Sequence, residues 1–330
     1  MRGSPVGAAW DLEFIHSGST VTAGIDIQDL YGTAGLRGTW DGEKVLADGQ
    51  LKFDSMVYNG YQLTKIRGPF SINGKQVVIG SKEALNQNNS PDGRAPVDNI
   101  GRLTADFIGG VISLDGNVKL EKQTSYHVKI TLAGGRLEQF AALYLPGQNK
   151  LRGLMNGLID LYGKGNSPRN LEGTGRLTIS PAALYELPVV VAIFKILNFG
   201  PPDKTAFRTA GFSFNIENSK CMFRRIELIG DTISLIGRGM VGFDGALALD
   251  FYSRSGRSQI PIPILREVLA ETFKGFVRVT VRGTTTNPSA LIQTMPQMDD
   301  ALRNFLGALA GPGQNRNAQQ QQPTRAASRP

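Results

Sequence analysis

The chain has 330 residues, enough to bury a sizeable core in one large or two ordinary domains. Its 40 glycines and 17 prolines indicate many turns, and its single cysteine, Cys221, excludes an internal disulfide. The formal net charge of +8 is spread along the chain, which favours a solvated basic surface. Attraction to anionic lipid head groups or to another acidic polymer is the alternative interpretation.

The N-terminal residues have no apolar segment typical of a secretory signal peptide. The longest apolar run, Leu187 to Leu197, contains Lys195 and is too short to cross a bilayer. Residues 10–14 already alternate between apolar and polar side chains, like a strand. We therefore expect a fragment of a longer protein, with a membrane-targeting part upstream.

Residues 10–80 predict a meander of short antiparallel strands, because apolar and polar side chains alternate along them. Asp-Gly and Asn-Gly pairs readily supply the positive φ of tight turns. Three such pairs are therefore predicted as hairpin turns: Asp41-Gly42, Asp48-Gly49 and Asn73-Gly74. The polar residues 81–99 predict a surface loop.

Strands are predicted to resume at residue 101, with Asp115-Gly116 as a further hairpin turn. In the segment that follows, apolar residues alternate with His127, Lys129 and Thr131, which predicts one apolar and one polar face. Residues 136–145 predict a short helix that ends before Pro146, and residues 151–180 predict further strands.

Ser180 and Pro181 predict the start of a helix over residues 182–198, because serine can cap a helix and proline fits its first turn. A bend is expected at Pro188. Apolar residues surround this helix, which implies burial or contact with lipid. Residues 261–275 and 288–309 are the other predicted helices, and residues 310–330 are predicted to be a disordered tail.

No motif in the sequence predicts a cofactor or a metal site. Residues 237–242 spell G-x-G-x-x-G, but a predicted strand follows where a dinucleotide site needs a helix, so the glycines are interpreted as strand kinks. His16 and His127 lie in alternating segments without the spacing of zinc ligands. Cys221 stands beside Met222 and Phe223 and is expected to be a buried apolar residue.

No catalytic or nucleic-acid-binding pattern is present either. Carboxylates mostly occupy the predicted turns, and basic residues do not cluster with aromatic ones. A carbohydrate-active β-helix enzyme would need a row of aligned carboxylates, and the predicted hairpins argue against it. The sequence therefore predicts a protein that is not an enzyme, has no cofactor and does not bind nucleic acid.

Several segments resemble the C-terminal region of AsmA-like proteins, a group related to TamB and to bridge-like lipid transporters. The resemblance covers residues 110–295 and extends more weakly back to residue 10. It rests on the strands and helix of residues 151–190, the strands of residues 212–251 and the closing strand with its Pro. The positions that fit the family pattern are Gly173, Gly175, Gly230, Gly237, Gly239, Gly283 and Pro288.

The resemblance implies a mainly β fold, an elongated curved antiparallel sheet (a β-groove) with about three short α-helices near the C-terminal half. It divides the chain into a β-meander over residues 1–100, an AsmA-like module over 101–309 and the tail over 310–330. It also implies a periplasmic location, with an upstream segment as the inner-membrane tether. The implied functions are phospholipid transport and outer-membrane assembly.

The expected partners are a phospholipid or other acyl lipid, the membrane surface and envelope proteins. The physical argument is that a long sheet with one apolar face must cover it with helices, a second sheet or a ligand. The alternatives are a sheet that folds on itself as a sandwich, and a structural or adhesive scaffold that binds other envelope proteins. The candidate groove or capping-helix residues are Val128, Ile130, Leu132, Leu184, Leu187, Val190, Ile193, Leu197, Phe212, Phe214, Ile216, Ile233 and Leu235.

Overall fold

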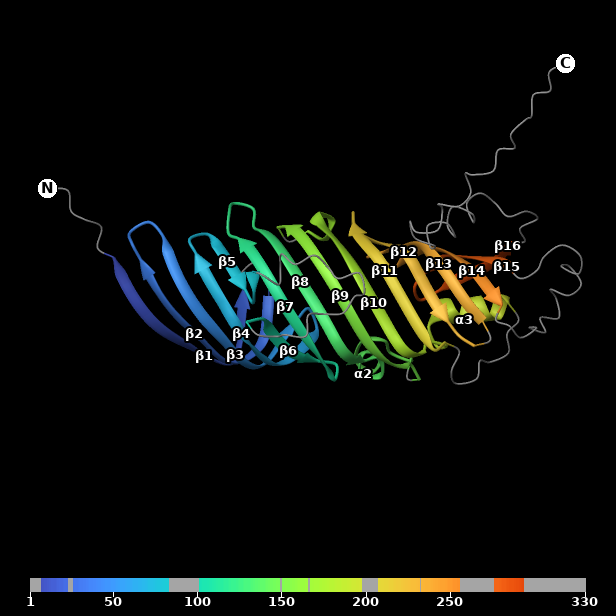
Figure 1. Ribbon diagram of the computed structural model, residues 1–330, viewed down its shortest axis with the longest axis horizontal. Helices are drawn as coiled ribbons and strands as arrows, with labels where there is room; N and C mark the ends of the chain where they lie inside the picture. Colours follow the sequence, from blue (N-terminus) through green and yellow to red (C-terminus); the bar gives the residue numbers. More distant parts are fainter. Residues whose placement is uncertain are drawn as a thin grey trace, which may run out of the picture.

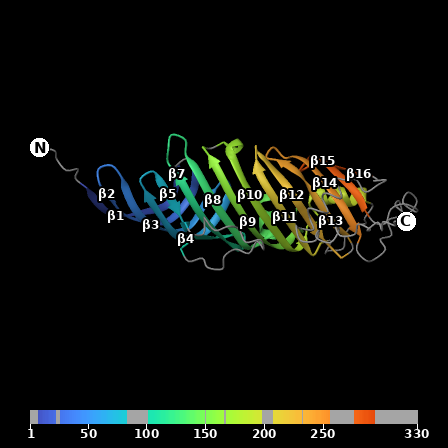
Figure 2. The same ribbon diagram turned by 45° about the horizontal axis from the view of Figure 1, so that its top comes forward.

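The structure, a computed structural model, describes residues 7–22, 26–82, 101–148, 150–165, 167–197, 207–231, 233–255 and 276–293. These residues form one antiparallel sheet of 16 strands, two α-helices and one 3-10 turn. The sheet is elongated and curved, with its strands side by side in chain order (Figures 1 and 2). The predicted fold class is confirmed.

The strands of the first half are β1 (Ala8–Thr22), β2 (Asp26–Trp40), β3 (Val45–Tyr58), β4 (Tyr61–Asn73), β5 (Gln76–Ile79), β6 (Leu103–Phe107), β7 (Gly110–Lys119) and β8 (Ser125–Arg136). Those of the second half are β9 (Arg152–Lys164), β10 (Leu171–Ala183), β11 (Thr209–Glu217), β12 (Lys220–Ile229), β13 (Ile233–Gly242), β14 (Ala246–Ser255), β15 (Phe276–Thr284) and β16 (Pro288–Gln293). The helices are α2 (Leu137–Tyr144) and α3 (Pro188–Ile196), and the 3-10 turn is η1 (Pro168–Asn170).

The strands β5 and β6 share one position in the sheet, because both pair with β4 on one side and β7 on the other. The chain leaves this position at Gly80, which has a φ of +71° and lies against Leu103 at the start of β6. Apart from Ser81 and Lys82, the predicted loop over residues 81–99 lies outside the described residues. A single strand position is thus filled by two pieces of chain.

A buried ion pair holds the two ends of this break together. The Asp115 carboxylate is fully buried on β7. It accepts hydrogen bonds from Ser81 N (2.9 Å) and Arg102 Nε (2.7 Å), and forms an ion pair with Arg102 Nη2 (2.6 Å). The predicted turn at Asp115-Gly116 is therefore wrong, because Asp115 pairs within the sheet instead of capping a hairpin.

The predicted turns at Asp41-Gly42 and Asn73-Gly74 are confirmed as hairpin connections. The one at Asp48-Gly49 is wrong, because both residues lie inside β3. Gly49 faces the ring of Phe70 on β4, and a Cβ on it would lie 2.3 Å from that ring. Here the glycine makes room for an aromatic side chain, which a turn pattern does not distinguish.

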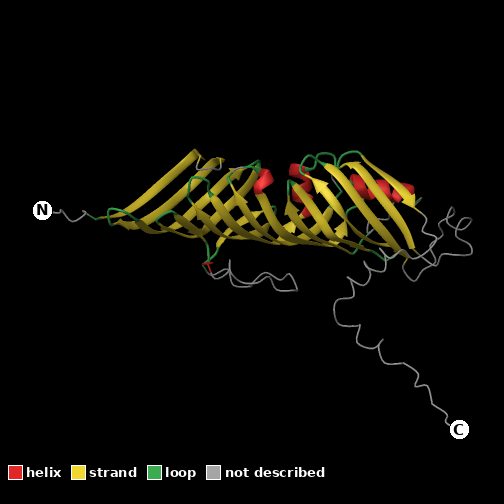
Figure 3. Cartoon of the chain, turned by 90° about the horizontal axis from the view of Figure 1, so that it is seen from above, coloured by secondary structure: helices red, strands yellow, loops and turns green. Residues whose placement is uncertain are grey.

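The predicted helix over 136–145 is confirmed as α2, which contacts β9. The predicted helix over 182–198 starts too early, because β10 continues to Ala183 after a register shift. Pro188 is the first residue of α3 and not a bend within it. Figure 3 shows the helices along one side of the sheet, and α3 contacts β15 and β16.

The predicted helix over 288–309 is wrong at its start, because Pro288 to Gln293 form β16 and pair with β15. The rest of it lies outside the described residues, as do the predicted helix over 261–275 and the predicted tail over 310–330. The division at residue 100 stays a prediction. The sheet itself continues across that point, since β4 pairs with β6 and β5 with β7.

Two apolar clusters are buried on the helix side of the sheet, which we call the inner face. The larger one joins α2, α3 and the inner faces of β9–β15, and includes Ile193, Leu235 and Val279, each of them fully buried. The smaller one consists of Leu30, Phe53, Ile66 and Ala105.

Bends in the first strands bring the smaller cluster together. The pairing of β1 with β2 shifts register near Ser19, and Asp29 and Lys65 have positive φ. Such bulges bend a strand and increase its twist. Beyond the bends, Val21 and Ile27 pack against the cluster, as does Ile112 on β7. These strands therefore cover part of their own sheet.

Candidate functional site

One register row of the inner face crosses the whole sheet and contains only apolar residues and glycines. Neighbours in this row are paired across successive strands from β1 to β16. We call it the apolar row: Leu12, Leu36, Gly49, Phe70, Ile79, Gly116, Val128, Leu161, Gly173, Ile216, Cys221, Val241, Leu247, Gly283 and Pro288. Most of its side chains are half-buried.

The middle of the apolar row belongs to neither buried cluster. Val128, Leu161, Ile216 and Cys221 are half-buried and lie outside both sets of packed residues. Their flanks are also apolar: Ile130 on β8 stands opposite Ile159 on β9 in the next row. These residues form the middle of the inner face, which we call the apolar strip. The described helices leave it partly open.

Glycines let aromatic rings lie flat on this strip. A Cβ on Gly175 would lie 2.2 Å from Cζ of Phe214 on the neighbouring strand, so the ring occupies the space above the glycine. The same arrangement places Phe251 over Gly237. The G-x-G-x-x-G segment thus lies in β13, as part of the sheet, which agrees with the interpretation of its glycines as places where a side chain would crowd.

Twelve of the thirteen predicted site residues fall into two groups, and all thirteen lie in or beside the inner face. Six lie on β8 and β11, on the inner face, and are half-buried: Val128, Ile130, Leu132, Phe212, Phe214 and Ile216. Six others are buried in the larger cluster: Leu184, Val190, Ile193, Leu197, Ile233 and Leu235. The remaining residue, Leu187, is half-buried and packs against that cluster.

The helix α3 fills the inner face at the C-terminal end of the sheet. Its side chains Val190, Ile193 and Phe194 point into the larger cluster, whereas Val191 is 47% exposed. The apolar character all around the helix predicted burial or lipid contact, and the structure places one side in the core and leaves the other exposed. The apolar strip is therefore filled at this end and partly open before it.

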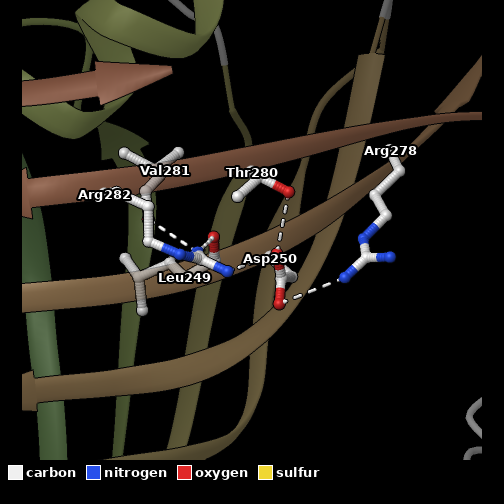
Figure 4. Close-up of polar contacts among 6 residues, drawn as sticks. All are labelled: Leu249, Asp250, Arg278, Thr280, Val281 and Arg282. Atoms are coloured by element: carbon white, nitrogen blue, oxygen red, sulfur yellow. Dashed lines mark hydrogen bonds and ion pairs between the residues drawn. The ribbon is translucent and has the colours of Figure 1, made fainter. Parts of the chain in front are cut away.

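The opposite, outer face carries the charges, often in compensated groups. On β14 and β15, Asp250 accepts hydrogen bonds from Thr280 Oγ1 (3.0 Å) and Arg282 Nη2 (3.3 Å), and pairs with Arg278 Nη2 (3.5 Å) (Figure 4). The other Arg282 nitrogen, Nη1, donates to the carbonyl oxygens of Leu249 and Val281, at 2.9 Å each. This group ties β14 and β15 together on the outer face.

A second polar group on the outer face was missed by the sequence analysis. His127 Nε2 lies 2.6 Å from Asp160 Oδ1, and the His127 ring stacks on Tyr162 with centroids 4.1 Å apart. Burial, and then the nearby Asp160 charge, raise the pKa of Tyr162. The register of β8 and β9 brings these three side chains together, and alternation within one strand does not reveal that register.

The described residues contain no group of three potential metal ligands and no helix long and apolar enough to cross a bilayer. Comparisons with protein-family models, curated proteins and solved structures gave no match. The resemblance to AsmA-like proteins therefore stays a prediction from the sequence.

Proposed function

We propose that the chain is a non-enzymatic cell-envelope protein whose β-groove binds or conducts acyl lipid, in phospholipid transport or outer-membrane assembly. The observation that supports this most is the apolar row, which runs from Leu12 to Pro288 without a polar side chain. A sheet that only has to bury a hydrophobic core would not need a row of partly exposed apolar residues across so many of its strands. Exposed apolar surface of this extent is typical of interaction sites.

The energetic argument concerns the middle of the strip. Each methylene of an acyl chain that leaves water gains about 0.8 kcal/mol, so a chain laid along a few strands gains several kcal/mol. The acyl chain would cover Val128, Leu161 and Ile216, which α2 and α3 leave only half-buried. The charged outer face would stay in water.

Photo-crosslinking tests this proposal. A benzophenone side chain placed at Val128 on the inner face should form lipid adducts in cells, detected by mass spectrometry of the purified protein. The matched control is Thr174, an exposed outer-face residue two strands away, where we expect no adduct. Failure to recover lipid at Val128 would contradict the proposal.

The alternative is a structural or adhesive scaffold, and the edge strand β1 favours it. Within the described residues β1 pairs only with β2, and it exposes Phe14 (48%) and Ile15 (73%). An open edge of this kind can accept a strand from another protein. A Phe14→Lys, Ile15→Lys variant should then lose its protein partner in a pull-down while the lipid adduct at Val128 persists.

A further inference from the structure

A pocket of about 640 Å³ opens where strand β8 begins and strand β9 ends, between the β7–β8 and β9–β10 connections. It is lined on one side by the stacked rings of His127 and Tyr162. Lys119, Lys164 and Arg169 also line it. Within the described residues, none of these three cations takes part in an ion pair, so the pocket has an excess of positive charge.

Few negative charges offset these cations. Among the described residues, Glu172 is the one carboxylate that lines the pocket. The neighbouring Asp160 is engaged by His127, at 2.6 Å. Elsewhere on the outer face, by contrast, Arg278 and Arg282 both pair with Asp250. A pocket with three uncompensated cations is suited to an anion with several acceptor oxygens.

The backbone fixes the position of this cationic group. Asn170 Nδ2 donates a hydrogen bond to the carbonyl oxygen of Lys164 (3.1 Å), which ties η1 to the end of β9. Arg169 is the middle residue of η1, which begins at Pro168. Arg169 and Lys164 therefore come from segments that are held together, and the anion would not have to order a loose loop.

The pocket also adjoins the inner face. Tyr126 and Gly163 line it, and the two are paired across β8 and β9 in the register row next to the apolar row. The Tyr126 ring lies over Gly163, where a Cβ would be 2.2 Å from its hydroxyl oxygen. The next residues along these strands on the same face are Val128 and Leu161 of the apolar row. His127, Tyr162 and Lys164 lie on the outer face, so a ligand that joins the pocket to the apolar strip would pass around the strand ends beside Tyr126 and Gly163.

We propose that this pocket binds the phosphate of an anionic lipid headgroup whose acyl chains lie on the apolar strip. This inference rests on the proposed function for the acyl chains, but its own content is the phosphate. The aromatic wall and the amide side chains of Asn117 and Asn170 would contact the rest of the headgroup.

The test compares three ligands by isothermal titration calorimetry: dihexanoyl-phosphatidylglycerol, dihexanoylglycerol without the phosphate, and glycerol 1-phosphate without acyl chains. We expect the full-length protein to bind the phospholipid at least tenfold more tightly than the neutral lipid. In a Lys164→Ala, Arg169→Ala variant this preference should disappear, while the affinity for the neutral lipid is unchanged. Both residues are exposed, so the variant should keep its fold, which circular dichroism checks.

The control variant, Lys44→Ala with Lys52→Ala, removes the same charge from the β2–β3 connection and β3, and should keep the preference. Equal affinity for both lipids, or a preference that survives in the pocket variant, would overturn the headgroup site and leave the proposed function standing. Binding of glycerol 1-phosphate alone, sensitive to the pocket variant but without lipid binding, would support a phosphate site and contradict the proposed function. If no ligand binds, both proposals fail.

Discussion

The two ends of the sheet bury their inner faces by different means. At the N-terminal end the strands β1–β4 bend at bulges and fold over their own sheet, and the cluster beneath them has four buried residues. At the C-terminal end a separate element, α3, packs on the inner faces of the last strands over a much larger cluster. A bend covers only what the strand can reach, whereas a helix brings apolar side chains of its own.

Neither device covers the apolar row between β1 and β12. Its residues there belong to neither cluster, and their side chains are half-buried except that of Leu12, which is exposed. The two edges differ in the same way. The short strand β16 starts with Pro288 and is contacted by α3, whereas β1 is longer. Both edge strands expose apolar side chains, Leu291 on β16 and Ile15 on β1 among them. Proline and short length protect an edge from pairing with other chains. Within the described residues, the C-terminal edge is thus better protected from strand pairing than the N-terminal one.

The largest expected effect lies at the break between β5 and β6. Arg102→Met leaves the Asp115 carboxylate buried without its partner, which we expect to cost about 3–5 kcal/mol of unfolding free energy. Urea unfolding followed by circular dichroism measures the loss. The control is Arg37→Met, which breaks an exposed pair with Asp11 and should lower the unfolding free energy far less. Equal losses in the two variants would refute the role assigned to the buried pair.

The second effect concerns the helix-covered end. Ile193→Ala removes a fully buried side chain and should cost about 2–5 kcal/mol. Hydrogen exchange should show the loss of protection in β13–β15 first, with β1–β3 less affected. Val191→Ala on the exposed side of the same helix is the control, with a change within about 0.5 kcal/mol. A uniform loss of protection along the sheet would mean that the two ends are one cooperative unit.

The smallest effect concerns the half-open middle. Burial raises the pKa of the Cys221 thiol from 9.0 to about 11, so the folded state favours the neutral form. Iodoacetamide at pH 8 should therefore react at least about tenfold more slowly with the folded protein than with the urea-unfolded one. The contribution of the buried neutral thiol to the unfolding free energy is full below pH 9 and is lost as the pH rises towards 11. Equal alkylation rates would show that this part of the row is open to water.

The alternation within single strands was sufficient to predict antiparallel β structure and the apolar face of β8, whereas the elongated curved sheet was implied by the resemblance. It failed where the same local pattern occurs in different structural settings. Asp-Gly marks a hairpin at Asp41, a ring-packing position at Asp48 and a buried ion pair at Asp115, and only the neighbouring strands distinguish these cases. The pocket beside His127 was missed for a related reason, because it joins residues from four strands and two connections whose register no single segment contains.

The break between β5 and β6 is a place where the chain can accept additional residues. Because Gly80 and Leu103 adjoin, the segment between them leaves and re-enters the sheet at one place, and its length does not set the register of any strand. The ion pair that holds the break lies on the outer face, with Asp115, so additional chain would emerge on the side away from the apolar row. This position is therefore suited to the insertion of a reporter or a whole domain, displayed from the polar surface while the inner face keeps its shape.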